Sequence, residues 1–167
     1  MDAETKEYFD ALESDLRGKK DRSAEIDELF QLSFLGDAET KEKVSWCVAK
    51  MGQNKYPDMR IVDILIPLTA DRNPQIRENV AWGIGEVAAA GIGDDRCVNT
   101  VVELMGDRES SVRGMAAWAA GRLVHKLSFR DEILIETVKS LLDDRSEFVR
   151  KSAEFALGDE NGAVGGN

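Results

Sequence analysis

The stretch DRNPQIRENVAWGIGE (residues 71–86) decides the fold, because it recurs twice further along the chain. The segments DRESSVRGMAAWAAGR (107–122) and DRSEFVRKSAEFALGD (144–159) align with it without a gap, at offsets of 36 and then 37 residues. A fainter copy lies 36 residues upstream, where Trp46 aligns with Trp82. A fixed period of this length is the sequence signature of a repeat architecture.

Each copy is preceded by a second apolar segment, and both segments have helical periodicity. The preceding segments are EIDELFQL (25–32), IVDILIPL (61–68), CVNTVVEL (97–104) and LIETVKSL (134–141). In the copy at 71–86 the apolar stripe recurs at i, i+4, i+8 and i+11, through Ile76, Val80, Ile84 and Val87. Each repeat is therefore predicted to be a hairpin of two helices. In the unit at 57–90, Pro67 should kink the first helix of the hairpin.

A two-helix unit cannot bury both of its apolar faces alone, so the units are expected to stack into an α-solenoid. We predict an all-α domain over residues 1–158, with four units at about 22–52, 57–90, 94–127 and 130–158. A helix over 3–16 should cap the first unit, and 159–167 should be a flexible, Gly-rich tail. Glu154 stands where the middle units have Ala81 and Ala117, and Lys139 stands where they have Ile66 and Val102. Both polar residues are expected at a solvent-facing end, so the fourth unit is interpreted as a C-terminal cap.

The pattern D-x(4)-[VI]-R-x-x-[AV]-A-W-x-x-G, as at 71–85, resembles HEAT repeats. The resemblance extends over residues 22–158 and is closest to the short HEAT-like class of phycobilisome lyases and many prokaryotic scaffold proteins. The period is shorter than the ~40–47 residues common for HEAT units. Tetratricopeptide units match less well, because their W-x-x-L-G signature is absent. The resemblance implies a structural ladder that bridges turn and helix from unit to unit, formed by Asp71, Arg77, Asp107, Arg113, Asp144 and Arg150.

One large ring recurs at the same helix position in every unit: Trp46, Trp82, Trp118 and Phe155. On a helical projection Trp82 lies about 120° from Ile76 and points away from the hairpin core. In a HEAT-like solenoid the second helices line the concave surface, so the rings would form a file along it. Two interpretations stay open, a packing seam between helices or a recognition stripe. The candidate partner-binding residues are Trp46, Glu78, Asn79, Trp82, Glu86, Met115, Trp118, Arg122 and Phe155.

Charge and composition argue against several classes of partner. The chain has 22 Lys and Arg residues against 32 Asp and Glu residues, a net charge of −10, which repels phosphate backbones and anionic lipid. No apolar run approaches the ~20 residues of a membrane span. Cys47 and Cys97 form no CxxC motif and are interpreted as core thiols in a reducing cytoplasm.

Catalysis finds little support in the residues. The one histidine, His125, is expected at the surface, and no Gly-rich phosphate loop occurs. Deoxyhypusine hydroxylase is similar only in its repeat pattern, because its iron-binding His-Glu pairs are missing from this chain. We therefore expect no catalytic residues, no metal and no cofactor.

The function expected from these observations is a non-enzymatic scaffold that binds a segment of another protein on its concave face, with nucleic acid and membrane not among its partners. The alternative is an enzyme or enzyme subunit of HEAT-like type, similar to DNA alkylation-repeat glycosylases or bilin lyases. A groove whose ionisable side chains are balanced in sign favours the scaffold, since a glycosylase needs a basic surface for backbone phosphates.

Overall fold

A computed structural model describes residues 1–158 of the chain, and the described residues form helices and turns without strands. The helices are α1 (Ala3–Arg17), α2 (Ile26–Leu35), α3 (Ala38–Gln53), α4 (Arg60–Leu65), α5 (Pro74–Ala89), α6 (Asp95–Leu104), α7 (Ser110–Leu127), α8 (Glu132–Ser140) and α9 (Glu147–Leu157). Short 3₁₀ turns lie at Ser23–Glu25, Ile66–Leu68 and Leu141–Asp143. The predicted all-α class is confirmed, and the predicted tail at 159–167 lies outside the described residues.

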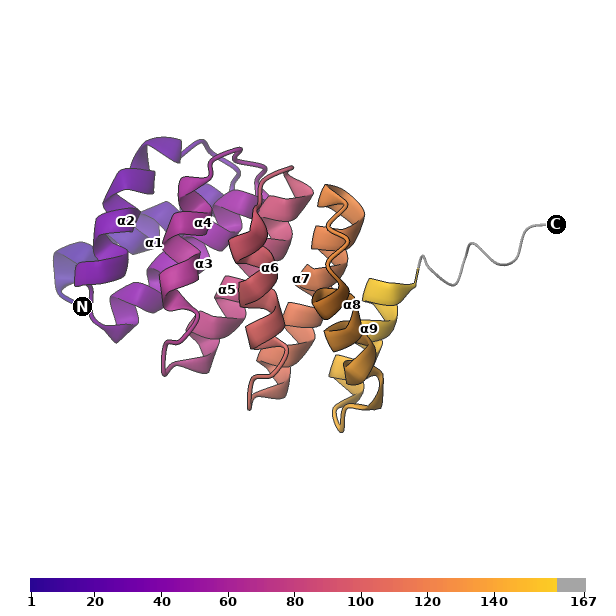
Figure 1. The fold of residues 1–167 in the computed structure, drawn as a ribbon. Helices are drawn as coiled ribbons and strands as arrows, with labels where there is room; N and C mark the ends of the chain where they lie inside the picture. The colour runs from indigo at the N-terminus through magenta and orange to yellow at the C-terminus, as the bar shows by residue number, and fades with distance from the viewer. Residues whose placement is uncertain (159–167) are drawn as a thin grey trace.

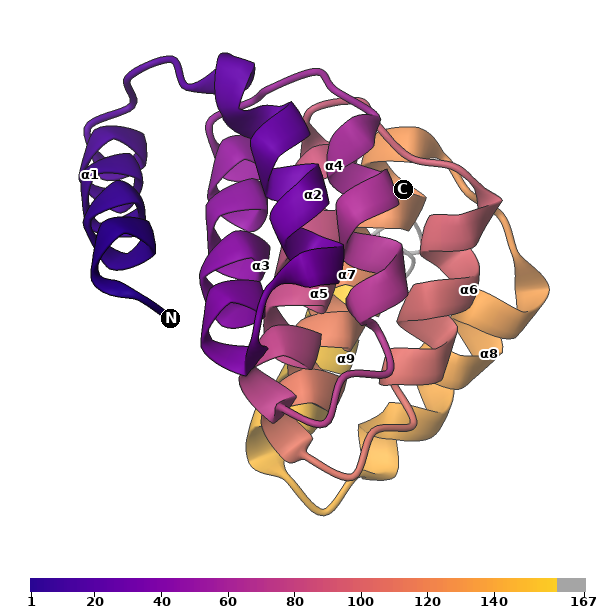
Figure 2. The same cartoon turned by 90° about the vertical axis from the view of Figure 1, so that its left-hand side faces the viewer.

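The helices pair into four hairpins, α2/α3, α4/α5, α6/α7 and α8/α9, which stack side by side (Figure 1). Viewed along the stack, they form two layers (Figure 2). The outer layer holds α2, α4, α6 and α8, and the inner layer holds α3, α5, α7 and α9. The inner helices make the most extensive contacts between repeats. The predicted α-solenoid of helical hairpins is confirmed.

Local sequence explains where the helices begin and end. The side chains of Asp37, Asn73, Asp94 and Asp131 each accept a hydrogen bond from a backbone N–H in the first turn of the helix that follows. Pro74 occupies the first position of α5, where a missing N–H costs nothing. At Pro67 the α-helix gives way to a 3₁₀ turn, as expected for an internal proline.

The core lies between the layers and between the repeats. Ile76, Val80 and Ile84 of the predicted stripe are fully buried, and so are Ala81 and Ala117. Glu154 and Lys139 are exposed on the last unit, as predicted. A side chain larger than alanine at position 81 or 117 would have to displace the neighbouring helix, and these small residues therefore set how closely the repeats approach.

Helix α1 lies beside α3, on the side away from α2 (Figure 2). Its apolar residues Phe9, Leu12 and Leu16 are fully buried. These side chains pack α1 against α3, so α1 covers the first unit, where a capping helix was predicted.

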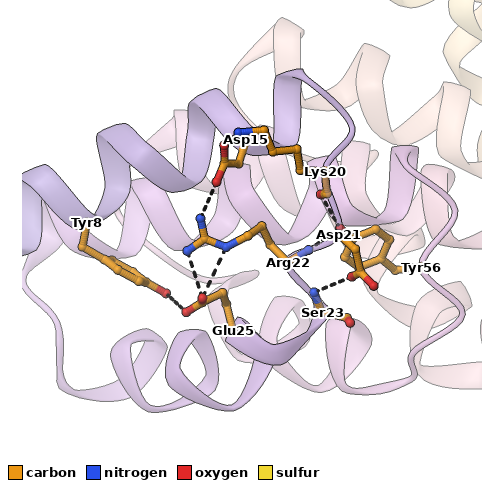
Figure 3. Close-up of polar contacts among 8 residues, drawn as sticks. All are labelled: Tyr8, Asp15, Lys20, Asp21, Arg22, Ser23, Glu25 and Tyr56. Atoms are coloured by element: carbon orange, nitrogen blue, oxygen red, sulfur yellow. Dashed lines mark hydrogen bonds and ion pairs between the residues drawn. The ribbon is translucent and has the colours of Figure 1, made fainter.

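A polar cluster fastens α1 to the first hairpin (Figure 3). The Arg22 guanidinium donates to Asp15 at 2.7 Å and to Glu25 at 2.9 Å, and the Tyr8 hydroxyl donates to Glu25 at 3.0 Å. The Tyr56 hydroxyl accepts from the Arg22 backbone N–H at 2.8 Å. These bonds tie the loop after α1 to both neighbouring segments, so α1 is an integral part of the domain.

Candidate functional site

Buried arginine–aspartate pairs join consecutive inner helices. The Arg77 guanidinium donates to both carboxylate oxygens of Asp107, at 2.6 and 3.0 Å, and to the backbone oxygen of Asp71 at 2.8 Å. Arg113 repeats this geometry with Asp144, at 2.8 and 2.9 Å. Each arginine therefore pairs with the carboxylate of the following repeat, which makes the bidentate bond a link between units.

The ladder runs from unit to unit, as the resemblance implies. The repeat pattern did not say which aspartate each arginine reaches, and the structure shows that Arg77 and Arg113 pair with the aspartate of the next repeat, not with the one six residues before. The Asp71 carboxylate accepts instead from the Asn73 N–H at 2.8 Å. Arg150 keeps the bond to the backbone oxygen of Asp144, at 2.6 Å, and no carboxylate among the described residues pairs with it. The ladder thus has two rungs in the described part of the chain.

The rungs shift the pKa values of their carboxyl groups. Burial alone would raise the pKa of Asp107, but the hydrogen bonds from Arg77 and from the Glu109 N–H hold it below its usual value. The hydrogen bond from Arg113 lowers the pKa of Asp144 in the same direction. Both carboxylates are therefore more stable as anions in the folded chain, which fits a structural role.

A second ladder on the outer layer was missed at the sequence level. Arg60 pairs with Asp27 at 2.5 Å, and Arg96 pairs with Asp63 at 2.8 Å. Asp27 and Asp63 lie 36 residues apart, as do Arg60 and Arg96, so the signal was present in the repeat. These pairs lie at the surface, where each contributes little to stability.

The three tryptophans lie partly exposed on one face of the inner layer, which confirms the helical projection. The ring centroids of Trp46 and Trp82 are 6.3 Å apart and tilted by 52°. The Arg17 guanidinium of α1 lies 4.5 Å from the Trp46 ring, and the Arg122 guanidinium lies 5.0 Å from the Trp118 ring. We call this surface the groove face.

One of these rings, Trp118, also seals a seam between helices. A Cβ atom on Gly85 would lie 2.2 Å from Cζ3 of Trp118, and one on Gly114 would lie 2.2 Å from Cε1 of Phe148. Each of these two rings therefore packs against a glycine of the preceding inner helix. For Trp118 the two interpretations left open by the sequence, seam and exposed stripe, describe different parts of the same side chain.

An aromatic hollow of about 290 Å³ opens on the groove face across α5, α7 and α9. Its lining residues are Trp82, Glu86, Met115, Trp118, Phe148 and Ser152. Four of the predicted partner-binding residues, Trp82, Glu86, Met115 and Trp118, are thus brought together. Phe148 was not predicted, because the repeat alignment places it under Ser111 and Gln75; a phenylalanine where other units have polar residues was the available signal.

A polar hollow of about 210 Å³ lies toward the first unit and has a different character. It is lined by Glu13, Arg17, Glu42, Lys43, Trp46, Gln75 and Asn79. Helix α1 supplies Glu13, whose carboxylate pairs with Lys43 at 2.6 Å. Contributions from α1 were not predicted, because α1 lies outside the repeat and its register against α3 has no counterpart in the other units.

The remaining predicted residues lie elsewhere on the groove face or beneath it. Asn79 was expected at the surface, but it is almost fully buried, and its amide donates to the Ser45 hydroxyl at 3.0 Å. Glu78, Arg122 and Phe155 line neither hollow, although Phe155 is 61% exposed. The hydrogen bond to Ser45 gives Asn79 a packing role between α3 and α5.

Residues 1–158 show neither a metal-binding cluster nor a membrane-spanning helix. That part of the chain contains no group of three or more His, Cys, Asp and Glu side chains placed to hold a metal ion. Nor does it contain a helix long and apolar enough to cross a membrane. Burial raises the pKa of both thiols, Cys47 and Cys97, which disfavours the reactive thiolate.

Stacked helical hairpins joined by ion-paired turns define this chain as an α-solenoid repeat protein. Within that class it belongs to the HEAT-repeat family, whose sequence model, described as HEAT repeats, matches residues 62–158. No curated protein matches the chain.

Among the solved structures similar to the chain are two engineered proteins and one designed armadillo repeat protein. One engineered protein from a structural genomics consortium gives a TM-score of 0.62 at 21% identity, over 81% of this chain and 62% of that chain. A designed armadillo repeat protein in complex with the peptide (KR)4 gives 0.60 at 21% identity, over 78% and 62%. A second engineered protein from the consortium gives 0.61 at 21% identity, over 84% and 38%. The chain thus spans less than two thirds of each, and at this identity the likeness shows the fold alone.

Proposed function

We propose that this protein is a non-catalytic scaffold whose groove face binds a segment of another protein. The observation that carries the proposal is the aromatic hollow, where Trp82, Trp118 and Phe148 from three consecutive inner helices leave ring surface open around one concavity. Partly exposed aromatic side chains in a concave site are typical of binding hot spots.

The architecture supports this proposal. HEAT-type solenoids expose a long row of inner helices, and each helix offers side chains at a constant spacing to a partner that runs along the row. The designed armadillo repeat protein of similar fold is a complex with the peptide (KR)4. By analogy with that complex, we propose that the present chain also binds a peptide.

A peptide selection tests the proposal. Random twelve-residue peptides displayed on phage are selected on the immobilised full chain, and synthetic copies of the enriched peptides are measured by fluorescence anisotropy. Phe148→Ala should weaken binding at least about tenfold, because a central aromatic anchor can contribute ≥2 kcal/mol. Ile133→Ala is the matched control, since Ile133 is 66% exposed on the outer-layer helix α8 and lies outside the hollow. Equal binding by the wild type and Phe148→Ala would contradict the proposal.

The enzymatic alternative has its own test. A glycosylase-like activity requires binding to the phosphate backbone, and such binding falls steeply with salt. Titration of labelled DNA at 50 and 200 mM salt should show no specific binding to this chain. Tight, salt-sensitive binding would favour the alternative over the scaffold. The unpaired thiols of Cys47 and Cys97 support our further proposal that the protein works in the reducing cytoplasm.

A further inference from the structure

Glu86 is a buried carboxylate without a cationic partner. Its side chain lies on the wall of the aromatic hollow, and the residue is 8% exposed. One oxygen, Oε1, accepts from the indole Nε1 of Trp82 at 3.2 Å. No cation of the described chain lies within ion-pair distance of either oxygen. A carboxylate that is removed from water without a counter-charge is costly, so this site is poised to receive a positive group.

The basic side chains of the groove face do not pair with Glu86. Lys43 pairs with Glu13 at 2.6 Å, and Lys151 pairs with Glu147 at 2.7 Å. Arg122, which holds the position of Glu86 in the next repeat, lies over the Trp118 ring instead. The balanced charge of this face therefore does not neutralise the hollow, where Glu86 is the one ionisable lining residue.

The other walls of the hollow suit a cation as well. The faces of Trp and Phe rings carry partial negative charge and attract ammonium and guanidinium groups, and tryptophan does so most strongly. Met115 adds a polarizable sulfur side chain to the same wall. The methylene stem of a long basic side chain can lie on these apolar surfaces while its charged end approaches the carboxylate.

We propose that the aromatic hollow binds one basic side chain, lysine or arginine, of the bound segment, with Glu86 as its counter-ion and with Trp82, Trp118 and Phe148 around it. This inference rests on the proposed function, since it specifies what the groove face recognises. The net charge of −10 supports it, because an acidic protein attracts basic segments and speeds their association.

The test uses the peptides enriched on the full chain. Enriched sequences should share a lysine or arginine at one position, and synthetic peptides then carry lysine, arginine or uncharged norleucine there. Norleucine has a similar length but no charge, so it should bind the wild type at least about tenfold more weakly than the basic peptide. On Glu86→Gln the preference for the basic peptide should shrink to about twofold or less. Glutamine can still accept from the Trp82 indole, which keeps the local geometry.

Glu103→Gln is the matched control. It removes the same charge from an exposed position of the outer-layer helix α6, away from the groove face, and should keep the full preference for the basic peptide. If Glu86→Gln does not fold, the comparison of lysine and norleucine on the wild type decides alone. Equal affinity of those two peptides, or enrichment of apolar residues only, overturns this inference. The scaffold proposal then stands provided that Phe148→Ala still weakens binding, whereas insensitivity to Phe148→Ala or the absence of any enriched peptide overturns both.

Discussion

The Trp118 ring lies so close to Gly85 of the preceding helix that a Cβ atom there would be 2.2 Å from Cζ3 of the indole. The contact joins α5 to α7 next to the aromatic hollow. It explains why a residue with poor helix propensity occupies the interior of α5. The absence of a side chain at position 85 sets where the Trp118 ring lies, and with it the shape of the hollow.

Gly85→Ala should therefore destabilise the fold, although alanine has a higher helix propensity than glycine. Alanine favours a helix by about 1 kcal/mol over glycine, but overpacking of a closed contact costs about 1–3 kcal/mol. Urea unfolding of Gly85→Ala should show a net loss of stability. Adding Trp118→Leu should recover part of the loss, since the shorter side chain leaves room for the Cβ. A variant as stable as the wild type would show that the ring can move away freely.

The buried ladder should contribute more to stability than the exposed one. Arg113→Ala leaves the Asp144 carboxylate without its bidentate partner in a site that is almost fully buried, so a loss of about 1–3 kcal/mol is expected. Arg96→Ala is the matched control, because its side chain is 47% exposed and its pair with Asp63 is screened. That change should cost about 1 kcal/mol or less. Similar losses in the two variants would remove the distinction between the ladders.

The ladder should also make stability depend on pH. Because the pKa of Asp107 and of Asp144 is lower in the folded chain than in the unfolded one, the unfolded state binds more protons in acid. Their contribution is present above the unfolded pKa of about 4 and is lost as the pH falls through the folded value. Unfolding curves at pH 7 and pH 3 should therefore differ less for Asp144→Asn than for the wild type. The reverse order would show that Asp144 is not held as an anion.

Much of the fold could be predicted from the sequence, because a repeated pattern reports the same environment several times. The stripe through Ile76 and Val80, the exposed position of Glu154 and the partial exposure of Trp82 all followed from periodicity and alignment. The partner of Arg77 did not follow, since a one-dimensional repeat does not say which neighbour a long side chain reaches. Only the stacked geometry places it beside Asp107.

The site was predictable where the repeat is regular and not where it departs from it. Trp82 and Trp118 were found because they recur, whereas Phe148 and the contribution of α1 occur once. Glu86 was a candidate partner-binding residue, but its lack of a counter-ion depends on where the side chains of Arg122 and Lys151 point. Such facts depend on side-chain packing and are not encoded in the spacing of residues.

Substitution of two aromatic residues should separate a ring that packs between helices from a ring that lies at the surface. Trp118→Ala removes a ring that packs on Gly85, so it should leave a partial cavity and cost about 2–4 kcal/mol. Phe155→Ala removes a ring of which 61% is exposed, so it should cost under about 1 kcal/mol. Chemical unfolding of both variants measures the difference. If Trp118→Ala were as well tolerated as Phe155→Ala, the ring would contribute to the surface alone, and the contact with Gly85 would have no stabilising role.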